Sequence, residues 1–332
     1  MRIAIIYNQP VPSYYDAAGE QGAVLGILNE VVAVRQALLE LGHSVICVAL
    51  ALPLAAAREK LSRLEVDLVF NLFEGFCGYP ETEADIPAIL AELGLAYTGC
   101  PPAALRLALD KAQTKAVLKA GGLDTPDFQL LSTASLSSFR LSYPCMVKPN
   151  GEDGSHGVSA ESVVSDSLSL GRQLAAVIQR YGGEEALVEE FIDGREFNAT
   201  VVGNSKGTVL AVSEIVFSLP PDMPRILTFA SKWQKGSVYF RGTRVVCPAR
   251  IPEDERQRIA AAAETAFRLT GCRSYARVDM RRDNNGRLAV IEVNPNPDIS
   301  PDAGVALQAQ ASGLNYRKFI EKIMTLALEG KC

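Results

Sequence analysis

The sequence has 332 residues, of which 48% are hydrophobic and 21% charged, so it holds enough apolar material for two or three folded domains. A formal net charge of −5 gives no electrostatic signature of nucleic-acid binding, and two histidines are too few for a histidine-rich zinc site. No segment is long and apolar enough to cross a membrane, and the seven cysteines include no CxxC pair, so we expect reduced thiols and a cytoplasmic location. The chain starts with a strand-like segment at 3–7, so no signal peptide is expected.

Residues 1–100 alternate strand-like and helix-like segments. Strands are predicted at 3–7, 45–50 and 67–72, and helices at 30–39 and 86–93. This alternation is typical of an α/β fold with a doubly wound parallel sheet. Ligands bind such sheets at the carboxyl ends of the strands, where the loops at 8–9 and 73–75 lie. No GxGxxG motif is present, so a dinucleotide site is not indicated.

The next stretch carries lysines and a glycine-rich loop. Residues 103–120 are predicted as one helix that ends at Gly121, with Lys111 and Lys115 one turn apart on one face. A strand ends at Lys148, where an ammonium group can bind a phosphate. The loop at 150–158 contains Ser155 between glycines, and its backbone N–H groups could wrap phosphate oxygens. A plain hairpin turn would explain the same loop.

A strand at 186–192 and a long irregular stretch follow a predicted helix at 167–180. Glu189 could accept hydrogen bonds from an adenine amine or ribose hydroxyls, and an exposed edge residue is an equally good interpretation. Residues 219–244 contain Lys232 and the only tryptophan, Trp233. Loops of this length are usually lids or binding loops, so we favour a lid over a core position for Trp233.

A predicted hairpin near the C-terminus brings acidic side chains together. After a helix at 252–269, two strands at 274–280 and 288–294 flank an Asn-Gly turn. Side chains alternate across a strand, so Asp279 should lie opposite Glu292, with Arg277 and Asn294 on the same face. The opposite face is expected to hold Val278, Met280, Ala289, Ile291 and Val293. Oxygen ligands of this kind suit Mg²⁺.

The alternative interpretation of this hairpin is a solvated polar face at the protein surface. The sequence that follows, at 294–298, is polar and contains two prolines, which cannot continue a central strand. A strand that ends in such a loop beside an acidic pair favours an active-site edge. A last helix is predicted at 315–328.

In their order along the chain, these segments resemble the ATP-grasp superfamily, in particular its D-alanine–D-alanine ligase-like branch. The resemblance covers nearly the whole chain and rests on Asp110-Lys111 with Lys115, 147–149, 151–157, 189–197, Lys232, Arg277-x-Asp279, Glu292-x-Asn294 and the segment 94–99. It implies a three-domain fold that is α/β at the N-terminus and α+β in the ATP-grasp part. The implied domains are 1–102 on the substrate side, 103–186 with the glycine-rich loop, and 187–332 with the lid and metal site.

The resemblance also implies roles for individual residues. Nucleotide binding is expected from Lys111, Lys148, Glu189, Glu190, Phe191, Ile192, Glu196 and Lys232, with Glu196 on the ribose and the lysines on phosphates. Asp279, Glu292 and Asn294 are the expected ligands of Mg²⁺, or of Mn²⁺ in its place. Catalytic roles are expected for Arg277, Lys232 and Ser155, and substrate contacts for Glu30, Glu74, Trp233 and Asp298.

The implied reaction is amide-bond formation between small amino-acid-like substrates. ATP phosphorylates a carboxylate, and an amine displaces phosphate from the acyl phosphate while a lid excludes water. Several substrate residues of the family are replaced: Trp233 stands for its tyrosine, 294–299 reads Asn-Pro-Asn-Pro-Asp-Ile, the acceptor-binding serine falls near Ala303, and Glu30 is a candidate for its N-terminal glutamate. We therefore expect an acceptor other than D-alanine, with D-alanine–D-alanine ligation itself as the nearest variant. The alternatives are a non-catalytic Mg-ATP sensor or scaffold and a carboxylase-type ATP-grasp enzyme, and a homodimer is expected by analogy.

Overall fold

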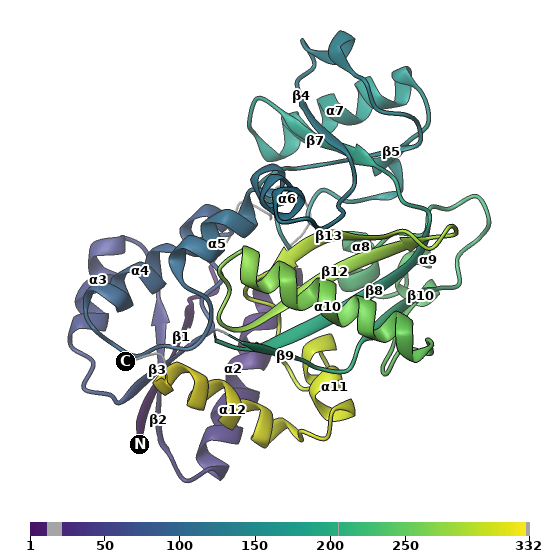
Figure 1. Cartoon of the computed structure of the whole chain (residues 1–332). Helices are drawn as coiled ribbons and strands as arrows, with labels where there is room; N and C mark the ends of the chain where they lie inside the picture. Colours follow the sequence, from purple (N-terminus) through teal and green to yellow (C-terminus); the bar gives the residue numbers. More distant parts are fainter. Residues whose placement is uncertain (12–21, 205, 330–332) are drawn as a thin grey trace.

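The computed structural model describes residues 1–11, 22–204 and 206–329. Its strands form three sheets that follow one another along the chain (Figure 1). The first sheet has the order β2-β1-β3 and is parallel throughout, with β1 at Arg2–Asn8, β2 at Ser44–Leu50 and β3 at Leu68–Asn71. The predicted parallel sheet at the N-terminus is therefore confirmed.

Helices cover both faces of this first sheet because its side chains alternate. Ile3 and Ile5 of β1 share a core with α2 (Gly22–Glu40) and with α12 (Tyr316–Glu329) from the far end of the chain. Ile6 points the other way, into a core with α3 (Leu54–Ser62) and α4 (Asp85–Glu92). The C-terminal helix thus completes the core of the N-terminal sheet, and Figure 1 shows α12 running beside α2.

The second sheet has the order β4-β7-β5-β6. Its strands are β4 at Phe128–Leu131, β5 at Cys145–Lys148, β6 at Val163–Val164 and β7 at Ala186–Glu190, and α7 covers it at Ser167–Tyr181. The predicted domain boundaries stay a prediction. The strand β7 begins at Ala186, where the expected boundary between the second and third domains lies. It pairs with β4 and β5 of the second sheet.

The single helix expected at 103–120 is wrong. The chain forms α5 (Pro102–Leu109) and α6 (Lys111–Ala120), which are separated at Asp110. Asp110 adopts an extended backbone with ψ of 95°, and its carboxylate accepts a hydrogen bond from the N–H of Gln113, 3.0 Å away. This is the geometry of a helix N-cap, so the aspartate side chain ends one helix and starts the next. Lys111 then begins α6, one turn before Lys115.

The third sheet has the order β11-β10-β8-β12-β13, and β9 pairs with β8. Its strands are β8 at Gly194–Gly203, β9 at Gly207–Val209, β10 at Ser213–Phe217, β11 at Thr243–Val246, β12 at Ser274–Asp283 and β13 at Leu288–Asn294. The helix α10 (Glu253–Leu269) packs on the face that holds Val278 and Met280. The opposite face therefore holds Arg277 and Asp279, and α11 (Gly304–Ala311) contacts β8.

The stretch 219–244, expected to be irregular, contains two short helices. They are α8 at Phe229–Trp233 and α9 at Val238–Gly242. Thr228 and Ser237 cap them, each accepting a backbone hydrogen bond on its side-chain oxygen, from Ser231 and Phe240 respectively. Thr228 and Ser237 are local signals for these two helices, and the sequence-based prediction of an irregular stretch did not use them.

Among the described residues, three short 3₁₀ helices lie at Pro80–Thr82 (η1), Leu136–Ser138 (η2) and Ala160–Ser162 (η3). Within the described residues, no helix has the length and apolarity that crossing a bilayer requires. The six described cysteines are free thiols, as predicted.

The dual role of Asp110 makes a stability prediction. Its carboxylate caps α6 and also accepts a hydrogen bond from Asn150 Nδ2 at 3.0 Å, which ties the glycine-rich loop to the helix. We expect Asp110→Ala to lower the free energy of unfolding by about 1 to 2 kcal/mol and to weaken ATP binding. The matched control is Asp166→Ala, which removes the cap of α7 and should lower stability without changing ATP binding.

Urea unfolding and ATP titration measure both quantities. Equal losses of stability in the two variants, with unchanged ATP affinity, would contradict a link between Asp110 and the loop.

Candidate active site

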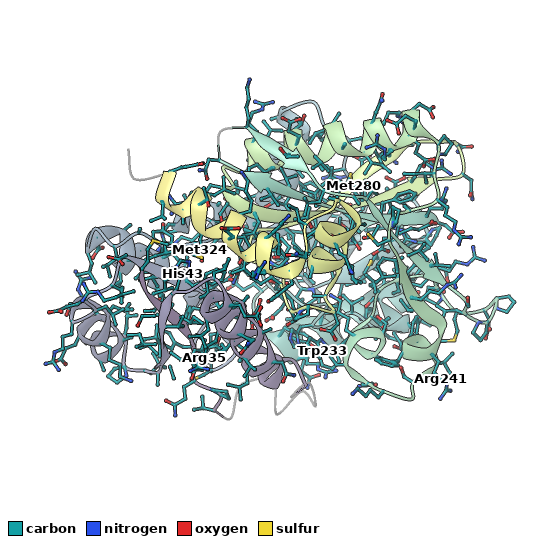
Figure 2. The ribbon with its side chains drawn as sticks, turned by 90° about the horizontal axis from the view of Figure 1, so that it is seen from below. Arg35, His43, Trp233, Arg241, Met280 and Met324 are labelled. Atoms are coloured by element: carbon teal, nitrogen blue, oxygen red, sulfur yellow. The ribbon has the colours of Figure 1, made fainter. Side chains whose placement is uncertain are left out.

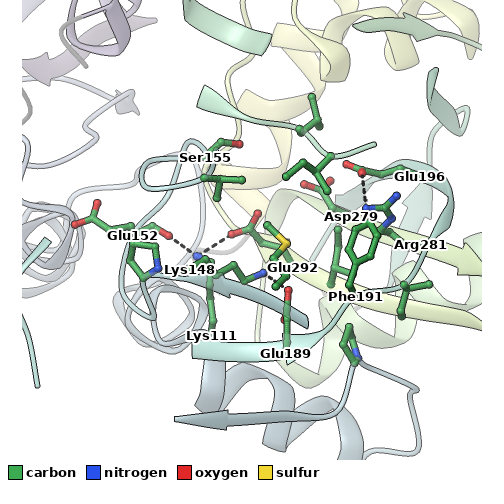
Figure 3. Close-up of a pocket in the computed structure, with 18 of the residues that line it drawn as sticks. Lys111, Lys148, Glu152, Ser155, Glu189, Phe191, Glu196, Asp279, Arg281 and Glu292 are labelled. Atoms are coloured by element: carbon green, nitrogen blue, oxygen red, sulfur yellow. Dashed lines mark hydrogen bonds and ion pairs between the residues drawn. The ribbon is translucent and has the colours of Figure 1, made fainter. Parts of the chain in front are cut away.

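A pocket of about 770 Å³, counted with its solvent-open mouth, lies between the second and third sheets (Figure 3). Its walls come from α6, β5, β7, the glycine-rich loop, the lid stretch and the hairpin β12–β13. It gathers most of the predicted nucleotide and metal residues, namely Lys111, Lys148, Ser155, Glu189, Glu190, Phe191, Ile192, Glu196, Lys232, Asp279 and Glu292. The predicted residues outside its lining are Arg277, Asn294, Glu30, Glu74, Trp233 and Asp298.

The hairpin places the two predicted carboxylates opposite each other. Asp279 pairs with Glu292, and Arg277 pairs with Asn294, as the alternation predicts. A β-bulge follows Asp279, so Met280 pairs with Val290 rather than with Ile291. The prediction that Ile291 faces the apolar core is therefore wrong: the extra residue shifts the alternation, and Ile291 lines the pocket beside Glu292.

Each carboxylate of this pair has a cation of the chain beside it. Arg277 donates from Nε and Nη2 to the two oxygens of Asp279 at 2.7 and 2.8 Å, and Asn198 donates to Oδ1 at 2.6 Å. Lys111 Nζ lies 2.9 Å from Glu292 Oε1. Burial alone would raise the pKa of Glu292, but the ammonium groups of Lys111 and Lys148 lower it to about 2. Glu292 is therefore ionised at every physiological pH.

These residues fit a divalent cation. Two carboxylates on adjacent strands face one pocket, and Mg²⁺ is commonly held by one or two carboxylates together with substrate phosphates. In the structure, Lys111 and Arg277 neutralise these two carboxylates. The third predicted ligand, Asn294, uses Oδ1 to accept the N–H of Asn296 at 2.9 Å. In the described ranges, no cluster of three or more acidic, histidine or cysteine ligands occurs, so the fit rests on Asp279 and Glu292.

Glu189 is held by two lysines. Its carboxylate oxygens lie 2.7 Å from Lys115 Nζ and 2.6 Å from Lys148 Nζ, and side-chain exposures are 4%, 2% and 9%. Burial opposes ionisation, yet the two ammonium groups lower the pKa of Glu189, while burial lowers the pKa of Lys115. The interpretation of Glu189 as an exposed edge residue is wrong. Lys115 was missing from the predicted site residues, although its position one turn after Lys111 is the signal that identifies it.

Two arginines pair with acidic side chains at the other end of the pocket. Arg287 donates to both oxygens of Glu190 at 2.7 and 2.8 Å and also bonds Asp124, so it joins β13 to the second sheet. Arg281 lies 3.8 Å from Glu196 and 5.2 Å from the centre of the Phe191 ring. Burial raises the pKa of Glu196 despite Arg281. The sequence analysis did not identify Arg281 or Arg287, whose partners lie far away along the chain.

Two residues of the glycine-rich loop adopt a left-handed backbone conformation. Ser155 lies in the left-handed region with φ of 65°, as does Gly157 with φ of 75°. A Cβ on Gly157 would approach Pro149 Cγ to 2.6 Å, so only glycine fits there. The buried ring of His156 lies 5.2 Å from that of Phe229, so the loop touches the first lid helix.

The two lid residues Lys232 and Trp233 lie in different surroundings. Lys232 lines the pocket without a hydrogen bond or ion pair to the described residues, and burial followed by the charge of Arg277 lowers its pKa. Trp233 packs on α2, where a Cβ on Gly26 would lie 3.6 Å from the indole (Figure 2). Its Nε1 is buried with no hydrogen-bond partner in the described structure. The lid therefore reaches the N-terminal part of the chain through Trp233.

The remaining predicted substrate residues gather beside the loop that follows β13. Glu30 accepts a hydrogen bond from the N–H of Ile299 at 2.9 Å, and Asp298 accepts one from the N–H of Ser300 at 2.7 Å. The backbone N–H of Glu74 donates to Asn8 at the carboxyl edge of the first sheet, 3.2 Å away. Glu83 joins this group, because its carboxylate accepts a hydrogen bond from Asn296 Nδ2 at 2.6 Å.

Comparison with known proteins identifies the family. Residues 117–325 match the family model described as D-ala D-ala ligase C-terminus, which is more than half of the chain. The chain belongs to the D-alanine–D-alanine ligase family. This confirms the resemblance seen in the sequence and the mixed helix and sheet fold. It also makes the protein an ATP-dependent ligase that forms carbon–nitrogen bonds.

Individual relatives span most of the ligase. A D-alanine–D-alanine ligase from Caulobacter sp. is 35% identical over 78% of this chain and 77% of that protein. An uncharacterized protein, y4sG from Sinorhizobium fredii, is 34% identical over 78% of this chain and 74% of that one. The crystal structure of a Bacillus anthracis D-alanine–D-alanine ligase complexed with ATP has a TM-score of 0.75 at 21% identity, covering 100% of this chain and 98% of that one.

The lysines around Glu189 make a prediction about stability. We expect Glu189→Gln to lower the free energy of unfolding of the ligase by about 3 to 5 kcal/mol, because two buried ammonium groups lose their shared counter-charge. The control is Glu92→Gln, which removes one partner of an exposed pair with Arg58 and should cost about 0 to 1 kcal/mol. Denaturant unfolding measures both, and similar small losses would show that the buried pairs add little.

Proposed function

We propose that this ligase activates a carboxylate with ATP as an acyl phosphate and joins it to an amine other than D-alanine. The observation that carries the proposal is the facing pair Asp279 and Glu292, each beside a cation of the chain and both lining one pocket with three lysines. A sensor or scaffold needs no such pair, since two close carboxylates repel each other unless a cation separates them.

The chain's own residues have separable tasks in this proposal. Lys111, Lys148 and Lys232 bind phosphate oxygens, and Glu189, fixed by Lys115, orients Lys148. Asp279 and Glu292 would hold Mg²⁺, with Asn294 as a candidate third ligand. The bound ion would offset charge between the phosphates and the attacking carboxylate. The adenine would lie against the strand at Glu189–Ile192, with the ribose at Glu196.

Arg277 and Lys232 are positioned for the second step. Arg277 is oriented by two hydrogen bonds to Asp279, which leaves its guanidinium beside the phosphate-binding lysines. We propose that it stabilises the oxyanion that forms when the amine attacks the acyl phosphate. Ser155 lies at the tip of the glycine-rich loop, where it would contact the substrate. The lid, anchored by Trp233 on α2, would exclude water from the acyl phosphate.

The acceptor side carries the departures from the family. Where the family has Asn-Thr-Ser-Pro-Gly-Met, this chain has Asn294-Pro295-Asn296-Pro297-Asp298-Ile299. Asn296 is turned toward the N-terminal part, donating from Nδ2 to Glu83 at 2.6 Å and to the carbonyl of Phe73 at 3.1 Å. An aspartate replaces a glycine in this loop, so the acceptor pocket of the chain differs in charge as well as in shape.

Phosphate release from Mg-ATP, measured across paired D- and L-amino acids and small amines, tests the proposal. Release that depends on one pair, with the condensed product identified by its mass, is expected. Tight Mg-ATP binding without release for any pair would favour the sensor, and bicarbonate-dependent release would favour the carboxylase-type enzyme.

We predict that Glu292→Gln lowers turnover by about 100-fold or more, because it removes half of the carboxylate pair. The Mg²⁺ concentration needed for half-maximal rate should rise in the same variant. The control is Glu255→Gln, which removes a carboxylate that pairs with Arg282 of the same hairpin on its α10 side. Full activity of Glu292→Gln would overturn the metal assignment, as would an equal loss in the control.

A further inference from the structure

Arg281 is a buried arginine of the nucleotide pocket whose hydrogen-bond donors are only partly used. It lies on β12, lines the pocket and is 5% exposed. Figure 3 shows it beside Phe191 and Glu196. Lys111 and Lys148, the lysines expected to bind phosphates, lie at the other end of the pocket in the same view. Arginine is seldom buried without partners, so the surroundings of Arg281 indicate its task.

The chain holds the guanidinium of Arg281 in one place. Its Nη2 donates to the carbonyl oxygen of Arg225 at 2.7 Å and to that of Gly194 at 3.3 Å. Its Cζ lies 5.2 Å from the centre of the Phe191 ring, which is the distance of a cation–π contact. Arg225 belongs to the lid stretch, Gly194 begins β8, and Phe191 follows β7. The guanidinium is therefore oriented before a ligand binds.

These contacts leave donors of Arg281 without acceptors. A guanidinium carries N–H groups on Nε, Nη1 and Nη2, and the two carbonyl oxygens occupy only Nη2. Nε is buried and has no hydrogen-bond partner in the described structure. Nη1 lies 3.8 Å from Glu196 Oε2, which is too far for a hydrogen bond. Buried donors without acceptors are costly, which indicates an acceptor from outside the chain.

Glu196 faces the same gap with unused acceptors. Its side chain is also 5% exposed, and its carboxylate accepts no hydrogen bond from the described residues. Burial raises the pKa of Glu196, and the charge of Arg281 opposes this rise, so Arg281 favours the ionised form. An ionised carboxylate only accepts hydrogen bonds, and a guanidinium only donates them. The gap between the two groups is therefore a donor on one side and an acceptor on the other.

A hydroxyl group fits this gap, because it donates one hydrogen bond and accepts another. It can bridge a carboxylate and a guanidinium whose nearest atoms are 3.8 Å apart. A phosphate oxygen would accept from Arg281 but would be repelled by the charge of Glu196. The adenine amine would donate to Glu196 and leave Arg281 unsatisfied. Among the parts of ATP, only the ribose hydroxyls meet both requirements.

We propose that Arg281 and Glu196 together bind a ribose hydroxyl of ATP, so that the ligase selects ribonucleotides over deoxyribonucleotides. The inference rests on the proposed placement of the ribose at Glu196, and it adds Arg281 as a second sugar-binding residue. The hydroxyl donates to the carboxylate of Glu196 and accepts from Arg281. No covalent bond changes at this contact, and Arg281 takes no part in phosphoryl transfer.

Calorimetric binding of three nucleotides tests the proposal, with Mg²⁺ present and no amino acid. The nucleotides are ATP, 2′-deoxy-ATP and 3′-deoxy-ATP. We expect ATP to bind about 10-fold or more tightly than at least one deoxynucleotide, because the missing hydroxyl leaves two charged groups without their hydrogen bonds. Equal affinities for all three would overturn the inference and leave the ligase proposal intact. Failure of every nucleotide to bind would overturn both.

Arg281→Met assigns the sugar preference to this arginine. Methionine keeps much of the length of the side chain and removes every donor. The affinity ratio between ATP and the disfavoured deoxynucleotide should fall by about 5-fold or more. A purely structural role of Arg281, or a contact with a phosphate, would weaken all three nucleotides equally. An unchanged ratio would therefore contradict the proposal.

Two further variants of the same strand complete the experiment. Arg281→Lys keeps a positive charge beside Glu196, so it serves if the methionine variant does not fold. Its single ammonium cannot hold two carbonyl oxygens and a hydroxyl at once, so the ratio should fall here too. The matched control is Arg282→Met, which removes an arginine that pairs with Glu255 at 2.6 Å on the α10 side. It should leave the ratio unchanged, and an equal fall would assign the effect to the hairpin as a whole.

Steady-state rates give a second readout once an amino-acid pair that supports phosphate release is identified. Arg281→Met should raise the KM for ATP by about 10-fold and leave kcat nearly unchanged. The reason is that the sugar contact is the same in the ground state and in the transition state. A large loss of kcat at unchanged KM would place Arg281 in the chemical step and contradict the proposal.

Discussion

The ion pair between Lys111 and Glu292, 2.9 Å long, joins the two halves of the nucleotide pocket. Lys111 begins α6 beside the second sheet, and Glu292 lies on β13 of the third. Both groups are charged because each lies near the other: the ammonium groups of Lys111 and Lys148 lower the pKa of Glu292 against the effect of burial. This pair places both signs of charge close together in the pocket and keeps them balanced within the chain itself.

Buried charge organises the rest of the pocket in the same way. Glu189 neutralises Lys115 and Lys148, Asp279 holds Arg277, and Arg287 ties β13 to Asp124 and Glu190. Except for Arg277 and Asp279, which lie two residues apart on β12, these pairs join elements that are distant in sequence.

The N-terminal part of the chain contributes side chains to the region around the loop after β13. Its parallel sheet directs Glu74 from the carboxyl end of β3 toward the loop after β13, and α2 brings Glu30 to the same loop. The lid reaches α2 through Trp233 on Gly26. The C-terminal helix α12 packs on the N-terminal sheet and carries Tyr316. The region around the loop after β13 is therefore assembled from both ends of the chain.

The sequence by itself determined the elements with strong local signals. The parallel sheet follows from alternating strands and helices, and the pairing of Asp279 with Glu292 follows from the period of two around an Asn-Gly turn. Only the tertiary structure decided the bulge at Ile291, the partners of Glu189 and the contact between Glu30 and Ile299. The physical reason is the distance along the chain over which a sequence pattern acts. Local patterns fix neighbours within a helical turn or across a tight hairpin, whereas Glu30 and Ile299 are brought together by packing of the whole chain.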